Sequence, residues 1–383
     1  MKFGIFFEHS VLKPWDEESE HRVYRQAVEQ VVTADEVGFD QAWEVEHHFL
    51  EEYSHSSSPE VFLSYCAAKT QRIRFGHGIA LMLPPVNHPA RVAERAATLD
   101  LLSDGRLEFG TGRSATWTEL GAFHCEPDDT KEMWDECTRA VVKMWTTDNF
   151  SWNGKYFSMP PRNVLPKPLQ KPHPPLWVAV QSPETAVQAG ERGMGMLGVT
   201  LGAPGDYQQM VKDYRRAIRH CEPVGEFVND QVNGVSFMYC GEDDAEAKMV
   251  GGMAATQFGV RAAHLVGVGS IYPSPAYHAH ASAAPLRDRP GDVVGPVRDG
   301  TPIGDPEACI RALKWWEEIG VDRMVFLINT GETIPNEKVL ASLRLFAKEV
   351  IPAMTKPERA DAAKNLELAR AEAIQRAAAG VPQ

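Results

Sequence analysis

The spacing of apolar positions changes repeatedly along the chain. Short apolar runs rich in β-branched and aromatic residues alternate with longer segments in which apolar residues recur every three or four positions. The short runs predict buried strands, and the longer segments predict amphipathic helices. The strand-like runs cover residues 3–7, 41–45, 73–83, 107–110, 176–180, 194–200, 232–239 and 323–328. This alternation predicts a parallel sheet covered by helices.

Each helical segment carries one apolar stripe, as in the set Val23, Ala27, Val31 and Ala34. Eight strand–helix units fit a closed barrel, so the expected fold class is α/β, a (β/α)8 TIM barrel with its active site at the carboxyl ends of the strands. A doubly wound open sheet is the alternative. Residues 8–10, which follow the first strand, lack the GxGxxG fingerprint of that fold.

Two segments interrupt the alternation, and barrels often carry functional elaborations in such insertions. Residues 150–175 predict a hairpin before the fifth strand, with a turn at Asn153 and Gly154, followed by a proline-rich run that covers one barrel end. Residues 251–304, rich in Ala, Gly, His and Pro, predict a mobile lid before the eighth strand. We therefore expect a barrel domain over residues 1–355 and a helical tail over residues 356–383.

Charge and cysteine usage narrow the class of protein. The 39 basic and 52 acidic residues give a net charge of −13, which argues against nucleic acid or an anionic membrane as the main partner. The six cysteines form no CxxC pair and suggest neither a zinc knuckle nor a disulfide framework. With no signal-like segment and no long apolar stretch, the chain is expected to be cytoplasmic and free of membrane segments.

The run from Trp43 to Phe49 closes the second predicted strand. Alternate strand residues share a face. Trp43, Val45 and His47 therefore lie on one face of the strand, and Glu44, Glu46 and His48 lie on the other. An inward histidine at the carboxyl end of a barrel strand can exchange a proton near neutral pH. The alternative is a structural role, in which the histidines cap the strand or hydrogen-bond to Glu46.

A metal site is the competing interpretation of the histidines. His47, His48, His77 and His88 could gather with Glu8 or Glu46 around an ion. Adjacent histidines on a strand diverge, and the chain has no HExxH motif. We therefore expect no metal site, and a metal-dependent barrel hydrolase remains a remote alternative.

Two segments suit an anionic cofactor. The fourth strand ends in Gly110, Thr111, Gly112 and Arg113, where glycine lets a ligand approach the backbone and arginine suits a phosphate. After the fifth strand, Ser182 is typical of a helix N-cap, and helix amino termini bind phosphate. Both segments also have structural interpretations, because strands often end in glycine and a capped helix needs no ligand.

The third predicted strand is almost entirely apolar from Ile79 to Leu83. Such a strand would form an apolar wall for a flat ring. Glu108, on the fourth strand, is expected to pair with a neighbouring charge, because an unpaired buried carboxylate is costly.

Several of these strings, in the same order, resemble the bacterial-luciferase-like family of flavin-dependent monooxygenases over nearly the whole chain. The matching stretches are residues 1–6, 38–40 and 46–49, the region from His88 and Pro89 to Arg106, and residues 301–310 before the last strand. Agreement distributed in this way is more specific than any single motif.

The resemblance implies a barrel that binds reduced FMN, reacts it with O2 and passes one oxygen atom to an organic substrate. By position, His47 matches the active-site histidine and Arg113 the flavin-phosphate arginine. Gln181 and Ser182 match residues beside the phosphate, although luciferase has an acid at the position of Gln181. Ala80 falls close to the segment behind the flavin ring.

One departure concerns the residue before Arg113, where luciferase has a reactive cysteine and this chain has Gly112. A dark monooxygenase is therefore expected, acting on a small aldehyde, ketone, alkane-like or aromatic substrate. From their strand-end positions, the substrate pocket is assigned to Phe6, Glu8, Trp43 and Trp117.

The chain has no nicotinamide fingerprint, so a separate flavin reductase is the expected transient partner. The family also suggests a homodimer. Within the same superfamily, an F420-dependent oxidoreductase is the alternative. A non-catalytic flavin-binding protein is the alternative from another class.

Overall fold

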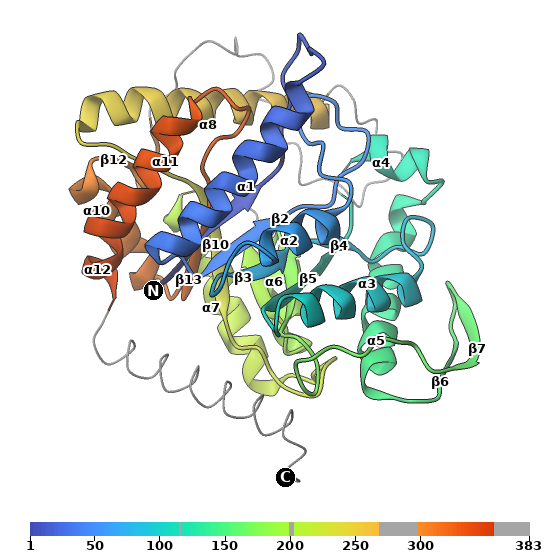
Figure 1. Cartoon of the computed structure of the whole chain (residues 1–383). Coiled ribbons are helices and arrows are strands. Elements are labelled where there is room, and N and C mark those ends of the chain that lie inside the picture. The colour runs from blue at the N-terminus through green and yellow to red at the C-terminus, as the bar shows by residue number, and fades with distance from the viewer. Residues whose placement is uncertain (115, 199–202, 268–296, 356–383) are drawn as a thin grey trace.

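The computed structural model describes residues 1–114, 116–198, 203–267 and 297–355 (Figure 1). Its strands are β1 (Lys2–Phe7), β2 (Gln41–Glu44), β3 (Arg74–His77), β4 (Ala80–Leu81), β5 (Leu107–Gly112), β6 (Phe150–Asn153), β7 (Ser158–Arg162), β8 (Leu176–Val180), β9 (Gly195–Gly198), β10 (Val232–Phe237), β11 (Tyr239–Cys240), β12 (Ile303–Gly304) and β13 (Arg323–Leu327). The principal helices are α1 (Ser19–Val37), α2 (Pro59–Ala67), α3 (Pro89–Leu102), α4 (Trp117–Ala122), α5 (Thr130–Thr146), α6 (Pro183–Glu191), α7 (Pro204–Ala217), α8 (Asp244–Gly267), α10 (Pro306–Glu318) and α11 (Asn336–Leu345).

Short helical segments complete these elements: η1 (Pro127–Asp129), η2 (Ile218–His220), η4 (Phe346–Val350) and α12 (Ile351–Met354). No helix among the described residues is long and apolar enough to cross a membrane. The predicted tail, residues 356–383, lies outside the described residues.

Parallel strands close into a ring in the order β1, β2, β3, β5, β8, β9, β10, β13 and back to β1. Each strand corresponds to one predicted apolar run. The short strand β4 continues the third run after β3 and pairs with the end of β5. The predicted (β/α)8 barrel is therefore confirmed, and the open sheet is excluded.

Side chains from alternate strand positions fill the barrel. The interior cluster includes Phe6, Trp43, Trp177, Val235 and Val325. The opposite strand faces pack against the helices, whose apolar stripes are buried as the sequence predicted. In α1, for example, the stripe from Val23 to Ala34 is buried against the sheet.

A buried charge cluster closes the amino-terminal end of the barrel. Glu108 accepts a hydrogen bond from Nε of Arg74 at 2.5 Å and another from the Trp177 indole at 2.7 Å, and Arg323 lies 3.5 Å away. Burial alone would raise the pKa of Glu108, but the two arginines and the indole outweigh it and hold that pKa at about 2. The expected pairing of this carboxylate is confirmed.

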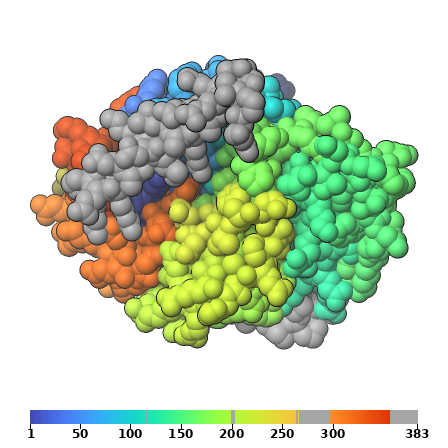
Figure 2. All heavy atoms as spheres, turned by 90° about the horizontal axis from the view of Figure 1, so that it is seen from below, coloured from blue at the N-terminus to red at the C-terminus, as the bar shows by residue number. Residues whose placement is uncertain are grey.

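The first insertion forms the predicted hairpin, β6 with β7, although Asn153 is the last residue of β6 and residues 154–157 form the connection to β7. In the proline-rich run that follows, Gln170 hydrogen-bonds to Asp100 and to the backbone of Leu107. Because Leu107 begins β5, this run covers the amino-terminal end of the barrel. Figure 2 shows that end, with α7 and the residues after it, yellow-green to yellow, near the centre.

The first part of the predicted lid is helical. Residues 251–267 continue the helix α8, which begins at Asp244. In Figure 1 this helix lies at the upper end of the molecule, and its residue Phe258 joins the barrel interior cluster. Side-chain packing against the barrel therefore stabilises a helix where composition suggested a loop. Residues 268–296 of the predicted lid lie outside the described residues.

Candidate active site

His47 forms an ion pair with Glu119 just beyond the carboxyl end of β2. Its Nδ1 donates to Oε1 of Glu119 at 3.0 Å. Burial would lower the pKa of His47, but Glu119 and then Glu8 raise it to about 9. The pKa of Glu119 is in turn lowered, because His47 and several hydrogen-bond donors outweigh its burial. At neutral pH this site therefore holds an imidazolium against a carboxylate.

Glu119 lies in the first turn of α4, and sequence reasoning missed it. The N-cap residue Thr116 accepts a hydrogen bond from the backbone N–H of Glu119 at 3.2 Å. The Glu119 carboxylate also accepts hydrogen bonds from Ser114 Oγ at 2.7 Å and from the backbone N–H of His48 at 3.0 Å. A threonine followed three residues later by glutamate is the sequence signature of a capping box, and this signal could have located the residue.

Glu8 lies on the other side of the His47 ring. It follows β1, only 7% of its surface is exposed, and its Oε2 is 3.8 Å from Nε2 of His47, too long for a hydrogen bond. Its Oε1 accepts a hydrogen bond from the Tyr53 hydroxyl at 3.4 Å, whereas Oε2 has no hydrogen-bond partner. Burial raises the pKa of Glu8 to about 7, although His47 partly opposes this shift.

Glu46 and His48, which neighbour His47, connect the end of β2 to β4. Glu46 Oε1 lies 3.2 Å from Nε2 of His48 and also accepts from the Asn87 amide at 2.7 Å. Its Oε2 accepts from the backbone N–H of Leu81 at 2.7 Å. These contacts hold the backbone next to Ala80 in a defined position relative to His47.

Ala80 and Arg113 lie on adjacent strand ends. Ala80 is buried in β4 and pairs with Thr111 of β5, two residues before Arg113. A side chain at Gly112 would meet Ile79, because an added Cβ would lie 2.8 Å from Ile79 Cγ1. The side chain of Ile79 therefore packs directly against the backbone of Gly112, beside Arg113. Nη1 of Arg113 donates to Thr130 Oγ1 at 2.9 Å.

The start of α6 lies near Arg113. Ser182 caps this helix, with its Oγ accepting from the Thr185 N–H at 3.3 Å, while Gln181 just before it is exposed. Glu184 binds Lys131 at 2.8 Å, and the pKa of its carboxyl is lowered first by Lys131 and further by Arg113. Two cations and a helix amino terminus thus share one region, an arrangement that suits a phosphate group.

The predicted pocket residues occupy different environments. Phe6 and Trp43 are buried in the barrel interior, and the Trp43 indole donates to Gln41 at the start of β2. Trp117 begins α4 and packs, half-buried, against a small separate cluster that contains Leu120. Of these predicted residues, Glu8 is the one whose carboxylate lies within 4 Å of the His47 ring, at 3.8 Å, whereas Trp43 is completely buried.

Clusters of three or more His, Cys, Asp or Glu side chains that could hold a metal ion do not occur among the described residues. His88 has a structural contact, since it caps α3 by accepting from the Ala90 N–H at 3.2 Å. His47 and His48 contact different carboxylates, Glu119 and Glu46.

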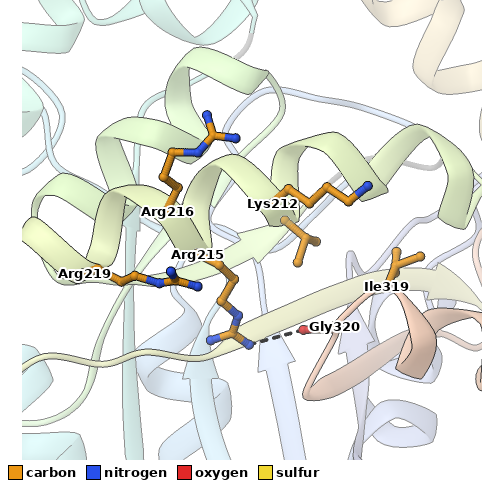
Figure 3. A pocket seen from close by; sticks show the side chains of 7 residues that line it. Lys212, Arg215, Arg216, Arg219, Ile319 and Gly320 are labelled. Carbon is orange, nitrogen blue, oxygen red and sulfur yellow. Dashed lines mark hydrogen bonds between the residues drawn. The ribbon is translucent and has the colours of Figure 1, made fainter.

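A surface hollow of about 340 Å³ lies between α7 and the turn that precedes β13 (Figure 3). Arg215 from this hollow donates to the Gly320 carbonyl at 3.2 Å and forms ion pairs with Asp230 and Asp322. Because these partners precede β10 and β13, the hollow lies at the amino-terminal end of the barrel. It is therefore separate from the candidate active site.

The fold and the site together define a (β/α)8-barrel enzyme with a buried acid–base pair where its strands end. The model of the luciferase-like monooxygenase family matches residues 1–323. The chain belongs to this family and is an oxidoreductase.

Among individual relatives, the oxygenase component of flavin-dependent trigonelline monooxygenase from Acinetobacter baylyi is 25% identical, over 93% of this chain and 96% of its own. The crystal structure of the monooxygenase RslO1 from Streptomyces bottropensis superposes with a TM-score of 0.76 at 27% identity, covering 93% and 100% of the two chains. An F420-dependent secondary alcohol dehydrogenase shares the fold, with a TM-score of 0.68 at 18% identity over 93% of this chain and 99% of its own.

Proposed function

We propose that this protein is the oxygenase of a two-component monooxygenase, which uses reduced FMN and O2 to oxygenate a small organic substrate. The observation that carries the proposal is the His47–Glu119 ion pair, because it places a proton donor at the barrel mouth. Arg113 follows β5, which is separated from β2 by β3, and suits the cofactor phosphate. The flavin-dependent relative, aligned over nearly the whole chain, supports the same reaction class.

The residues present fit a flavin phosphate and a flat ring. Arg113 and Lys131 provide positive charge, and the first turn of α6, capped by Ser182, provides backbone N–H groups. The Ile79 side chain packs against Gly112 next to Ala80 and offers an apolar wall to a ring. Reduced FMN, when bound, supplies the electrons that activate O2, and the protein supplies position and protons.

His47 is the proposed catalytic residue. Glu119 accepts its Nδ1–H and fixes the ring, so Nε2 is the nitrogen that remains for the substrate or cofactor. With a pKa of about 9, His47 carries a proton at neutral pH and can donate it as a general acid. Glu119 acts through His47 and is therefore a positioning residue. The substrate is an aldehyde, a ketone, an alkane-like compound or an aromatic compound.

A deazaflavin would suit the same phosphate contacts, and the F420-dependent dehydrogenase of the same fold makes this the second candidate. Anaerobic titration of the protein with reduced FMN and with reduced F420, followed by addition of O2, distinguishes the two. We expect binding of reduced FMN and its reoxidation by O2. Tight binding of F420 without binding of FMN would replace the first proposal by the second.

A separate reductase and a homodimer complete the proposal. Product should form only when a flavin reductase, NAD(P)H and O2 are all supplied. If reduced FMN binds but a broad panel of substrates gives no oxygenated product, the chain would instead be a non-catalytic flavin-binding protein. Sedimentation of the purified protein tests the dimer.

A further inference from the structure

A gap separates the side chains of His47 and Glu8. Nε2 of His47 and Oε2 of Glu8 are 3.8 Å apart, so they do not bond to each other. A single oxygen atom placed beside this gap can lie at hydrogen-bond distance from both. Glu8 Oε2 is buried and has no hydrogen-bond partner, and a buried acceptor left in that state is costly. A ligand atom in this gap would provide the missing hydrogen-bond partner of Glu8 Oε2.

The two sides of the gap require opposite hydrogen-bonding roles of that atom. The imidazolium Nε2–H of His47 is a donor, and the Glu8 carboxylate is an acceptor. A carbonyl oxygen satisfies the donor but brings no hydrogen for Glu8. An ammonium satisfies Glu8 but meets the positive charge of His47. A hydroxyl accepts from one side and donates to the other, so it satisfies both.

The surroundings of the gap are aromatic. The ring of half-buried Tyr53 lies with its centroid 5.7 Å from that of His47, at an angle of 75°. The ring centroid of Phe258, in α8, lies 5.0 Å from that of Tyr53. Pairs of aromatic rings in edge-to-face or offset-stacked contact stabilise one another beyond the area that they bury. The hydroxyl is thus best supplied by a ring.

We propose that the substrate is a phenol, whose hydroxyl oxygen lies between Nε2 of His47 and Oε2 of Glu8. Glu8 thereby becomes the residue that selects hydroxylated rings from other small organic compounds. This assignment rests on the proposed monooxygenase function, whose substrate it narrows. It concerns binding alone, so it can be measured without turnover.

The charges of the two groups set a pH window. The pKa of Glu8 is about 7 and that of His47 about 9, so both groups are charged between these values. Glu119 and Tyr53 are the other titratable groups facing Glu8, and the pKa of Tyr53 is well above its usual value because of burial. Phenol affinity should therefore rise with pH through about 7, where Glu8 ionises, and fall as His47 loses its proton near 9.

Isothermal titration calorimetry of the full chain with 4-ethylphenol, 4-ethylanisole and 4-ethylcyclohexanol at pH 8 tests the assignment. A hydrogen bond to a charged group predicts that the phenol binds roughly 10- to 100-fold more tightly than its methyl ether. Glu8→Gln should remove most of this difference. The matched exposed variant Glu337→Gln on α11 should retain it.

The outcomes separate the two proposals. Equal affinity for the phenol and the ether, no binding of the phenol, or a preference that survives in Glu8→Gln would overturn the role of Glu8. Equal affinity for the cyclohexanol and the phenol would overturn the assignment to aromatic rings. FMN affinity, measured on the same samples, should be unchanged by Glu8→Gln. If FMN fails to bind while the phenol preference is present, the monooxygenase proposal fails and the hydroxyl site stands.

Discussion

Nδ1 of His47 and Oε1 of Glu119 lie 3.0 Å apart, although 72 residues separate them in the chain. The pair forms where the ends of β2 and β5 converge on the same end of the barrel. Glu119 takes one ring nitrogen of His47 and leaves the other, Nε2, facing Glu8. This orientation accounts for the direction of the pKa shift at His47 and for our choice of it as the proton donor.

Replacing Glu119 by Gln should lower the pKa of His47, because the carboxylate is the main group that raises it. Loss of a charge-assisted hydrogen bond predicts a fall in kcat/KM of roughly 10- to 100-fold at neutral pH. NMR titration of the His47 ring measures the shift directly. A purely structural role would change the Tm but leave the His47 titration and the pH profile of kcat where they were.

His47→Ala should abolish most turnover, with a loss of roughly 100- to 10,000-fold, the range for removing a general acid. Flavin affinity should stay within about threefold, because the proposed phosphate contacts lie at Arg113 and α6 rather than at His47. Steady-state assays with a supplied reductase and fluorescence titration with FMN measure the two quantities. Turnover equal to that of the wild type would remove His47 from the mechanism.

Arg113→Ala should weaken FMN binding by roughly 10- to 100-fold through loss of a charged contact to the phosphate. The control is Arg216→Ala, an exposed arginine of α7, which should leave the FMN Kd unchanged. Riboflavin, which lacks the phosphate, should bind both variants and the wild type equally. An unchanged FMN affinity in Arg113→Ala contradicts the phosphate role.

Glu108→Gln should destabilise the barrel by about 3 kcal/mol, because it leaves buried arginine charge without its carboxylate. The folded-state pKa of about 2 lies below the ordinary value of 4.5. The stability that this carboxylate contributes is therefore present above pH 4.5 and lost as the pH falls through about 2. Urea unfolding at pH 7 and pH 3 measures both effects. A variant as stable as the wild type at pH 7 would show that the charge cluster contributes nothing.

The barrel could be predicted from the sequence because it rests on local regularities. Each of the eight apolar runs is a strand of the ring, and the periodic segments between them are helices with buried stripes. The hairpin around Asn153 and Gly154 is equally local. The helical conformation of residues 251–267 was not predicted, because their Ala- and Gly-rich composition carries little helical signal, whereas packing of Phe258 into the barrel stabilises α8.

By itself, the sequence predicted the eight strand–helix units and the active end of the barrel, because spacing and alternation follow from backbone geometry, and the resemblance to the family singled out His47. The tertiary structure decided which groups surround His47. Glu119, Glu8 and Tyr53 belong to separate segments, and they meet only because the strand ends converge when the barrel closes. Burial among these charges then sets the pKa of each group, which depends on distance and solvent exposure and is therefore a property of the folded chain.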